Sequence, residues 1–93
     1  MAGFTTRVEL HYANAEDYQK LHEAMKKQGF SRTINGDNGI TYHLPTAEYL
    51  YYGEITASSV VDKAKVAAGS VKNSYEVLVT EAVRWNWYGL KQV

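Results

Sequence analysis

Apolar and polar side chains alternate along residues 4–11. A period of two places the two sets on opposite faces of an extended chain, which predicts a strand with one buried side. The residues on the expected buried face are Phe4, Thr6, Val8 and Leu10. Alternation over residues 75–83 predicts a second half-buried strand. Residues 84–88 are expected to continue that strand, with both tryptophans on one side.

Two stretches carry the spacing of three to four residues between apolar side chains that is typical of helices. The first spans residues 15–28, after Asn14, whose side chain can cap free backbone amides. It ends at Gly29, which favours left-handed backbone. The second spans residues 57–68, can be capped by Thr56 or Ser58, and ends at Gly69. Its alanine-rich apolar side predicts close packing against a sheet.

The middle of the chain is extended and contains a turn. Residues 30–34 and 40–44 flank the sequence Asn-Gly-Asp-Asn-Gly at positions 35–39, which predicts a hairpin. A further strand is expected over residues 47–55, just beyond Pro45. The pattern leaves open whether residues 40–44 form a separate short strand or lead directly into the next one.

The predicted element order is strand, helix, strand, strand, helix, strand, which is typical of the split βαββαβ sandwich. The expected fold is therefore α+β and ferredoxin-like, with a mostly antiparallel sheet and two helices on one face. A length of 93 residues without a Gly/Ser-rich linker predicts a single domain over residues 1–93. The other face of such a sheet is often open to solvent or to a partner.

Charge and cysteine content narrow the function classes. Ten basic and ten acidic residues give a formal net charge of zero, which disfavours strong non-specific binding to nucleic acid. The sequence has no cysteine, so it has no disulfide, thiol nucleophile or thiolate metal site. This composition is compatible with a cytoplasmic location, which we predict. No apolar run approaches the roughly 20 residues that cross a bilayer, so no membrane association is expected.

The three histidines do not have the spacing of metal ligands, and we expect no metal and no cofactor. A general acid or base role in RNA cleavage would be chemically feasible for His11 or His22, because imidazole titrates near neutral pH. No carboxylate pair or phosphate-binding loop stands out, and no catalytic residue is assigned.

Aromatic residues are the most informative part of the composition. Eight tyrosines, two tryptophans and two phenylalanines make up 13% of the chain. Because Tyr51 and Tyr52 are adjacent in a predicted strand, they must face opposite sides, and one is expected outside the core. Tyr49 shares a face with Tyr51, and Trp85 shares one with Trp87. The two pairs would build one patch if their strands are neighbours.

Three interpretations of these aromatic residues remain open. They could form a small core with favourable cross-strand pairs. They could be a protein-binding surface, because Tyr, Trp and Arg are enriched at interface hot spots. They could stack on the bases of single-stranded RNA. The residues predicted for a protein contact are Tyr49, Tyr51, Tyr52, Arg84, Trp85, Trp87 and Tyr88.

A spaced set of core and turn residues runs through residues 4–80. It consists of Tyr18-x-x-Leu21-x-x-x-Met25-x-x-x-x-Phe30-Ser31, Gly39-Ile40, Leu44-Pro45 and Thr56-Ala57-Ser58-x-Val60. This set resembles the GhoS-type antitoxin endoribonucleases, a small bacterial family with a ferredoxin-like fold. The resemblance implies cleavage of a toxin messenger RNA without a metal-rich site. In such a protein, phosphate would be contacted by Arg7, Lys20, His22 and Arg32.

The segment 84–90 and the tyrosine run 49–52 are unlike that family. We therefore interpret the chain as an engineered variant of a bacterial scaffold in which the aromatic positions are the altered ones. The leading prediction is a non-enzymatic protein-binding module whose partner is another protein, and whose aromatic patch or 35–39 hairpin could block an enzyme's cleft. A free sheet edge could also support a homodimer. The alternative is a GhoS-like antitoxin that binds or cleaves single-stranded messenger RNA.

Overall fold

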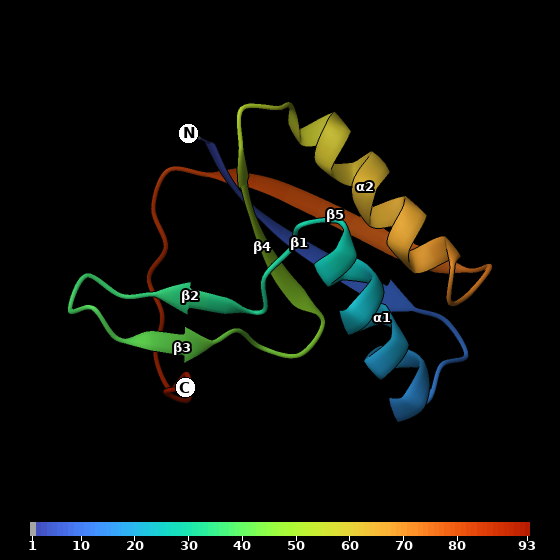
Figure 1. Ribbon diagram of the computed structural model, residues 1–93, viewed down its shortest axis with the longest axis horizontal. Helices are drawn as coiled ribbons and strands as arrows, with labels where there is room; N and C mark the ends of the chain where they lie inside the picture. The colour runs from blue at the N-terminus through green and yellow to red at the C-terminus, as the bar shows by residue number, and fades with distance from the viewer. Residues whose placement is uncertain (1) are drawn as a thin grey trace.

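The computed structural model describes residues 2–93 and has the predicted α+β ferredoxin-like architecture (Figure 1). Its elements in chain order are β1 (Ala2–Leu10), α1 (Ala15–Lys27), β2 (Thr33–Asn35), β3 (Thr41–His43), β4 (Glu48–Gly53), α2 (Ala57–Gly69) and β5 (Tyr75–Ala82). The strands and helices predicted from the pattern are confirmed, with shifts of a few residues at their ends.

The main sheet has three strands in the order β4-β1-β5, and both pairings are antiparallel. Its register places Thr6 opposite Tyr49 on one side and opposite Val79 on the other. Ser31 adds a single antiparallel bridge to Leu50 on the outer edge of β4. The chain then leaves this sheet, and β2 pairs with β3 in a separate two-stranded sheet. Residues 41–43 are therefore a strand of their own.

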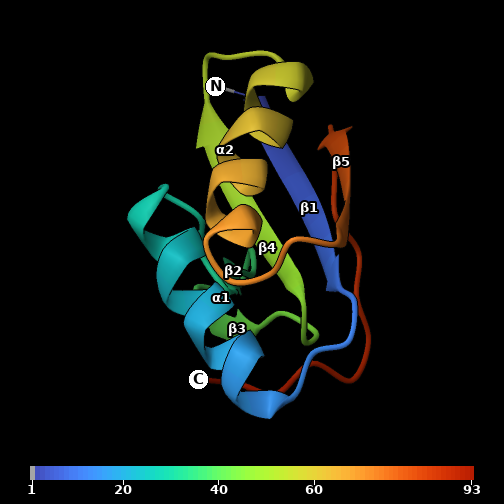
Figure 2. The same cartoon turned by 90° about the vertical axis from the view of Figure 1, so that its right-hand side faces the viewer.

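Both helices cover one face of the main sheet, as predicted (Figure 2). Helix α2 contacts β1 and β5, and α1 packs beside α2. Thr56 caps α2, because its hydroxyl accepts a hydrogen bond from the Ser59 amide at 3.1 Å. Within residues 2–93, neither helix combines the length and the apolar character needed to cross a bilayer.

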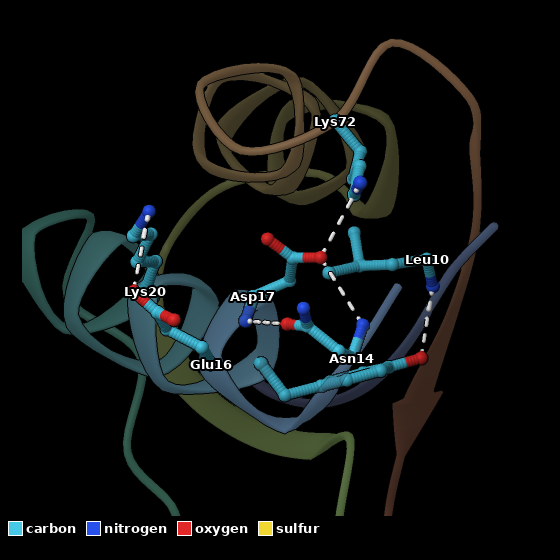
Figure 3. A network of polar contacts seen from close by, with 7 residues as sticks. Leu10, Asn14, Glu16, Asp17, Lys20 and Lys72 are labelled. Atoms are coloured by element: carbon cyan, nitrogen blue, oxygen red, sulfur yellow. Dashed lines mark hydrogen bonds and ion pairs between the residues drawn. The ribbon is translucent and has the colours of Figure 1, made fainter. Parts of the chain in front are cut away.

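The start of α1 is fixed by a reciprocal cap. The Asn14 side chain accepts from the Asp17 amide at 2.9 Å, and the Asp17 carboxylate accepts from the Asn14 amide at 3.1 Å. Lys72, just beyond α2, lies 3.3 Å from the same carboxylate (Figure 3). The backbone hydrogen bond from Asn14, with help from the Lys72 charge, lowers the pKa of Asp17. This contact joins the N-terminal end of α1 to the loop after α2.

The core lies between the sheet and the helices. Its buried side chains include the even-numbered residues of β1 from Phe4 to Leu10, Tyr49 from β4, and small residues from α2. The buried apolar cluster contains Phe4, Val8, Leu10, Leu21, Met25, Phe30, Tyr49, Val60, Ala64, Ala67 and Ala68. Thr6 is also fully buried, and its hydroxyl has no hydrogen-bond partner among the described residues.

The prediction that residues 84–88 continue the last strand is wrong. Strand β5 ends at Ala82, and the chain turns away from the sheet edge toward the β2–β3 hairpin (Figure 1). Trp85 packs against Gly3 of β1. Because Gly3 pairs with Ala82, a continued edge strand would carry Trp85 past this position. We refer to residues 83–93 as the closing segment.

Candidate functional site

A groove of about 730 Å³ lies between the β2–β3 hairpin and the closing segment. It combines four aromatic side chains with amide and charged groups. Its lining consists of Ile34, Asn35, Gly36, Asp37, Asn38, Tyr42, Tyr52, Val83, Arg84, Trp85, Asn86 and Trp87. The hairpin and β4, which are close in sequence, therefore meet the distant closing segment here.

The first aromatic pair anchors the closing segment to the main sheet. Trp85 and Tyr52 meet edge to face, with their ring centroids 5.9 Å apart. The Trp85 indole nitrogen donates a hydrogen bond to the Thr5 hydroxyl. A side chain at Gly3 would collide with the Trp85 ring, so this contact requires glycine at that position of β1. The pair covers one corner of the sheet face that the helices leave free.

The second aromatic pair joins the closing segment to the hairpin. The rings of Tyr42 and Trp87 lie 5.5 Å apart at an interplanar angle of 60°. The Tyr42 hydroxyl accepts a hydrogen bond from the Asn38 side-chain amide at 3.2 Å. Asn38 therefore links the turn of the hairpin to the aromatic wall of the groove.

The rim of the groove on the hairpin side is held by its own hydrogen bonds. The Gly36 amide donates to the Ile40 carbonyl at 2.8 Å, and the Ile40 amide donates to the Asn38 side chain at 3.0 Å. The Thr41 hydroxyl donates to the Asn35 side chain at 2.7 Å. These contacts organise the turn at residues 35–40 and leave Asp37 exposed at its tip.

The structure divides the residues predicted for a protein contact between the two faces of the sheet. Tyr52, Arg84, Trp85 and Trp87 line the groove, and Tyr88 beyond it is fully exposed. The condition for one common patch, that the two strands are neighbours, is not met, because β1 lies between β4 and β5. In addition, the closing segment leaves the sheet, and Tyr49 and Tyr51 point toward the helices.

Tyr49 and Tyr51 belong to the helix-covered side. Tyr49 is fully buried, and its hydroxyl lies 2.6 Å from Nδ1 of His22. Burial raises the pKa of Tyr49 to about 12. Tyr51 is half-buried, packs on Phe30 at 5.2 Å between ring centroids, and has the Lys63 ammonium 5.7 Å from its ring. Tyr49 therefore has no surface with which to contact a partner.

The contact residues predicted from the sequence omit part of the groove lining, although the same prediction includes the 35–39 hairpin as a segment that could block a cleft. The omitted residues include Tyr42, Asn35, Asn38 and Asn86. The amide-rich turn at residues 35–39 was the available signal, because Asn and Gly in a tight turn present side-chain and backbone polar groups at the surface.

The four residues expected to contact phosphate do not converge. Arg7 lies on the free face of the sheet, 4.0 Å from Glu48. Lys20 on α1 lies 3.9 Å from Glu16. His22 and Arg32 do meet, in a separate hollow of about 450 Å³. That hollow is lined by His22, Glu23, Lys26, Phe30, Ser31 and Arg32.

His22 has an altered proton affinity in this hollow. Burial, and secondarily the charge of Arg32, lower the pKa of His22 below the ordinary value of 6.5. The imidazole is therefore neutral at physiological pH, and it is oriented by the Tyr49 hydroxyl.

His11 makes a cross-strand contact at the other end of the sheet. Its Nδ1 lies 2.7 Å from the Ser74 hydroxyl, and its Nε2 lies 3.1 Å from a Glu76 oxygen. His11 is half-buried, whereas Ser74 and Glu76 are exposed, and none of the three lines the groove. Within residues 2–93, no group of three or more His, Asp or Glu side chains is arranged to hold a metal ion.

No protein-family model matches the chain, and no curated protein is similar to it in sequence. The resemblance to GhoS-type antitoxins therefore stays a prediction, and the groove is the feature of the molecule from which a function can be proposed.

Proposed function

We propose that the chain is a non-enzymatic protein-binding module whose contact surface is the groove between the hairpin and the closing segment. The observation that carries this proposal is the meeting of two aromatic pairs from separate parts of the chain in one hollow. Tyrosine and tryptophan supply large, rigid contact area at a low cost in side-chain entropy.

The polar groups of the groove also suit a protein partner. Amide side chains can donate to and accept from a peptide backbone, and Arg84 can pair with a carboxylate. Asp37 and Arg84 carry opposite charges, so the groove lacks the positive charge that binding to a polyanion requires. Apolar rings surrounded by polar groups are the usual composition of a protein interface.

The shape of the hairpin supports a blocking role. The β2–β3 hairpin extends away from the helices (Figure 1), and its turn is organised by internal hydrogen bonds. We propose that the partner is an enzyme or another protein with a cleft that receives this turn.

In this proposal the chain is an engineered variant of a bacterial scaffold, with the aromatic positions as the altered ones.

Affinity capture with matched variants tests the proposal. The immobilised chain is exposed to a bacterial lysate, and retained proteins are identified by mass spectrometry. Trp87→Ala and Arg84→Ala should each reduce capture of a specific protein by about tenfold or more, as expected for interface hot spots. Val66→Ala, which alters an exposed residue on α2 outside the groove, is the matched control. Equal capture by all variants would contradict the proposal.

A second candidate function is RNA binding or cleavage at the hollow lined by His22 and Arg32. A neutral imidazole beside an arginine favours it, since a neutral imidazole can accept a proton while the guanidinium holds phosphate. The test is cleavage of single-stranded RNA by the wild type and by His22→Gln. Tyr49→Phe is the control, because it removes the hydrogen bond and keeps the imidazole. Cleavage that is lost only in His22→Gln would favour this candidate.

A further inference from the structure

The end of the closing segment pairs with the outer edge of β3 at an isolated bridge. The His43 amide donates to the Lys91 carbonyl at 2.8 Å, and the Val93 amide donates to the Thr41 carbonyl at 2.9 Å. This register places Gln92 opposite Tyr42 in an antiparallel bridge. The outer edge of β3 therefore already binds an extended segment, which comes from a distant part of the same chain.

The residues that lead to this paired end have few contacts that fix their backbone. Residues 84–90 make no backbone-to-backbone hydrogen bond with any described residue. Gly89 has a left-handed φ of +77°, and Tyr88 is fully exposed. Segments with few backbone hydrogen bonds and little burial open at a lower free energy than the rest of a fold. The end of the closing segment can therefore leave β3 while Trp85 stays anchored on β1.

Opening would expose a complete docking site for a strand. The Thr41 carbonyl and the His43 amide would face solvent as an acceptor and a donor on one edge, which is the pattern that strand addition uses. The Tyr42 ring beside them would lose its contact with Trp87 and present an aromatic surface. Backbone pairing with one aromatic anchor thus defines what the edge can recognise.

We propose that the outer edge of β3 is a strand-addition site for an extended peptide segment of a partner protein that carries a tryptophan or tyrosine anchor. Residues 87–93 are the resident occupant, and the partner's segment displaces them. A second copy of the chain is a poorer occupant, because each copy already satisfies its own edge. This site adjoins the groove of the proposed function and shares Tyr42 and Trp87 with it. Its test uses a purified peptide, so it can fail or succeed independently of the capture experiment.

The first experiment separates the resident segment from the domain. The chain is truncated after Asn86, which keeps the Trp85 anchor, and is titrated with a peptide of residues 87–93 up to about 1 mM, near the effective concentration of a short linked segment. NMR should show saturable shifts at the Thr41 and His43 amides. The full chain should bind the same peptide at least about tenfold more weakly than the truncated chain does, because its own segment competes for the β3 edge. A folded truncated chain that shows no shifts at β3 would overturn the proposal.

Two methylated peptides test the hydrogen-bond register. N-methylation at Val93 removes the donor to Thr41, and the peptide should lose its binding by about tenfold or more. N-methylation at Gln92 is the matched control, since the Gln92 amide points away from β3 in this register. Equal binding by the two peptides would overturn strand pairing.

A full-length variant covers the case in which truncation unfolds the chain. Val93→Pro removes one donor from the resident strand and should increase affinity for the unmodified peptide several-fold, whereas Gln92→Pro should not. Equal affinities in the two variants would contradict displacement. A full chain that forms a dimer through this edge in solution would also overturn the assignment, because a second copy would then fill the site.

Discussion

The two faces of the main sheet differ in what covers them, although the side chains of β1 alternate regularly between the two. The even-numbered residues of β1 point into a continuous apolar core under both helices. The odd-numbered residues point to the other face, where the closing segment covers Gly3 and Thr5 while Arg7 and Glu9 stay exposed. One face is held by many close-packed contacts, and the other by one tryptophan and one side-chain hydrogen bond.

This difference shows which face is available for function. A dense core tolerates little change, because cavities and overpacking both destabilise it. A face covered by a loosely held segment can exchange that cover for a partner at low cost. The groove and the β3 edge both lie along the closing segment, so the binding proposals concern the surfaces that this segment covers.

The largest effect is expected from a cavity on the helix-covered face. Phe4 is fully buried, and Phe4→Ala should lower the free energy of unfolding by about 3–5 kcal/mol. Urea denaturation followed by circular dichroism measures the change. A loss below about 1 kcal/mol would mean that this face is not the close-packed one.

A smaller loss is expected from overpacking on the opposite face. Gly3→Ala should lower stability by about 1–3 kcal/mol, because the added methyl group displaces the Trp85 ring. Trp85 fluorescence should shift to the red as the ring becomes solvated. The cost should largely disappear in a Trp85→Ala background. Gly69→Ala is the control, since its methyl group would make only ordinary contacts with Tyr75, at 3.6 Å from the hydroxyl oxygen and 3.9 Å from a ring carbon.

Replacing the neighbouring threonines Thr5 and Thr6, which lie on opposite faces of the sheet, should change the free energy of unfolding in opposite directions. Thr5→Val removes the acceptor of the Trp85 indole and should cost about 1 kcal/mol. Thr6→Val removes a buried hydroxyl without a partner among the described residues and should raise stability by up to about 1 kcal/mol. Paired urea titrations compare the variants. Effects of the same sign would contradict the different environments assigned to the two faces.

The smallest effect concerns pH. Since folding lowers the pKa of His22 below 6.5, the unfolded chain takes up this proton at a higher pH than the folded chain. The stabilising contribution is therefore complete above about pH 6.5 and is lost as the pH falls toward the folded-state pKa. His22→Gln should flatten the dependence of unfolding free energy on pH between about 7.5 and 5.5. Identical slopes in wild type and variant would contradict burial of the neutral imidazole.

Periodicity was sufficient to predict the helix-covered face. Alternation located β1 and β5, helical spacing with capping residues located α1 and α2, and their order predicted the ferredoxin-like fold. Each of these signals lies within a short segment of the chain. It is strong because the buried face of each element is apolar and the exposed face is polar.

The closing segment could not be predicted in the same way. Its path depends on Trp85 packing over Gly3 and on Gln92 pairing with Tyr42, contacts between residues about fifty to eighty positions apart. Alternation continued past Ala82 and indicated a longer strand, although the chain turns there. Alternation already separates Tyr49 and Tyr51 from Tyr52, but only the tertiary path shows that Tyr52 is the one that meets Trp85 and Trp87 in the groove.

Hydrogen–deuterium exchange on the complex with the captured partner tests the central claim most directly. Binding at the groove predicts slower amide exchange in residues 35–43 and 83–88, with the amides of α1 and α2 unchanged. Protection that is confined to residues 20–32, around the hollow of His22 and Arg32, with an unchanged hairpin would contradict the account.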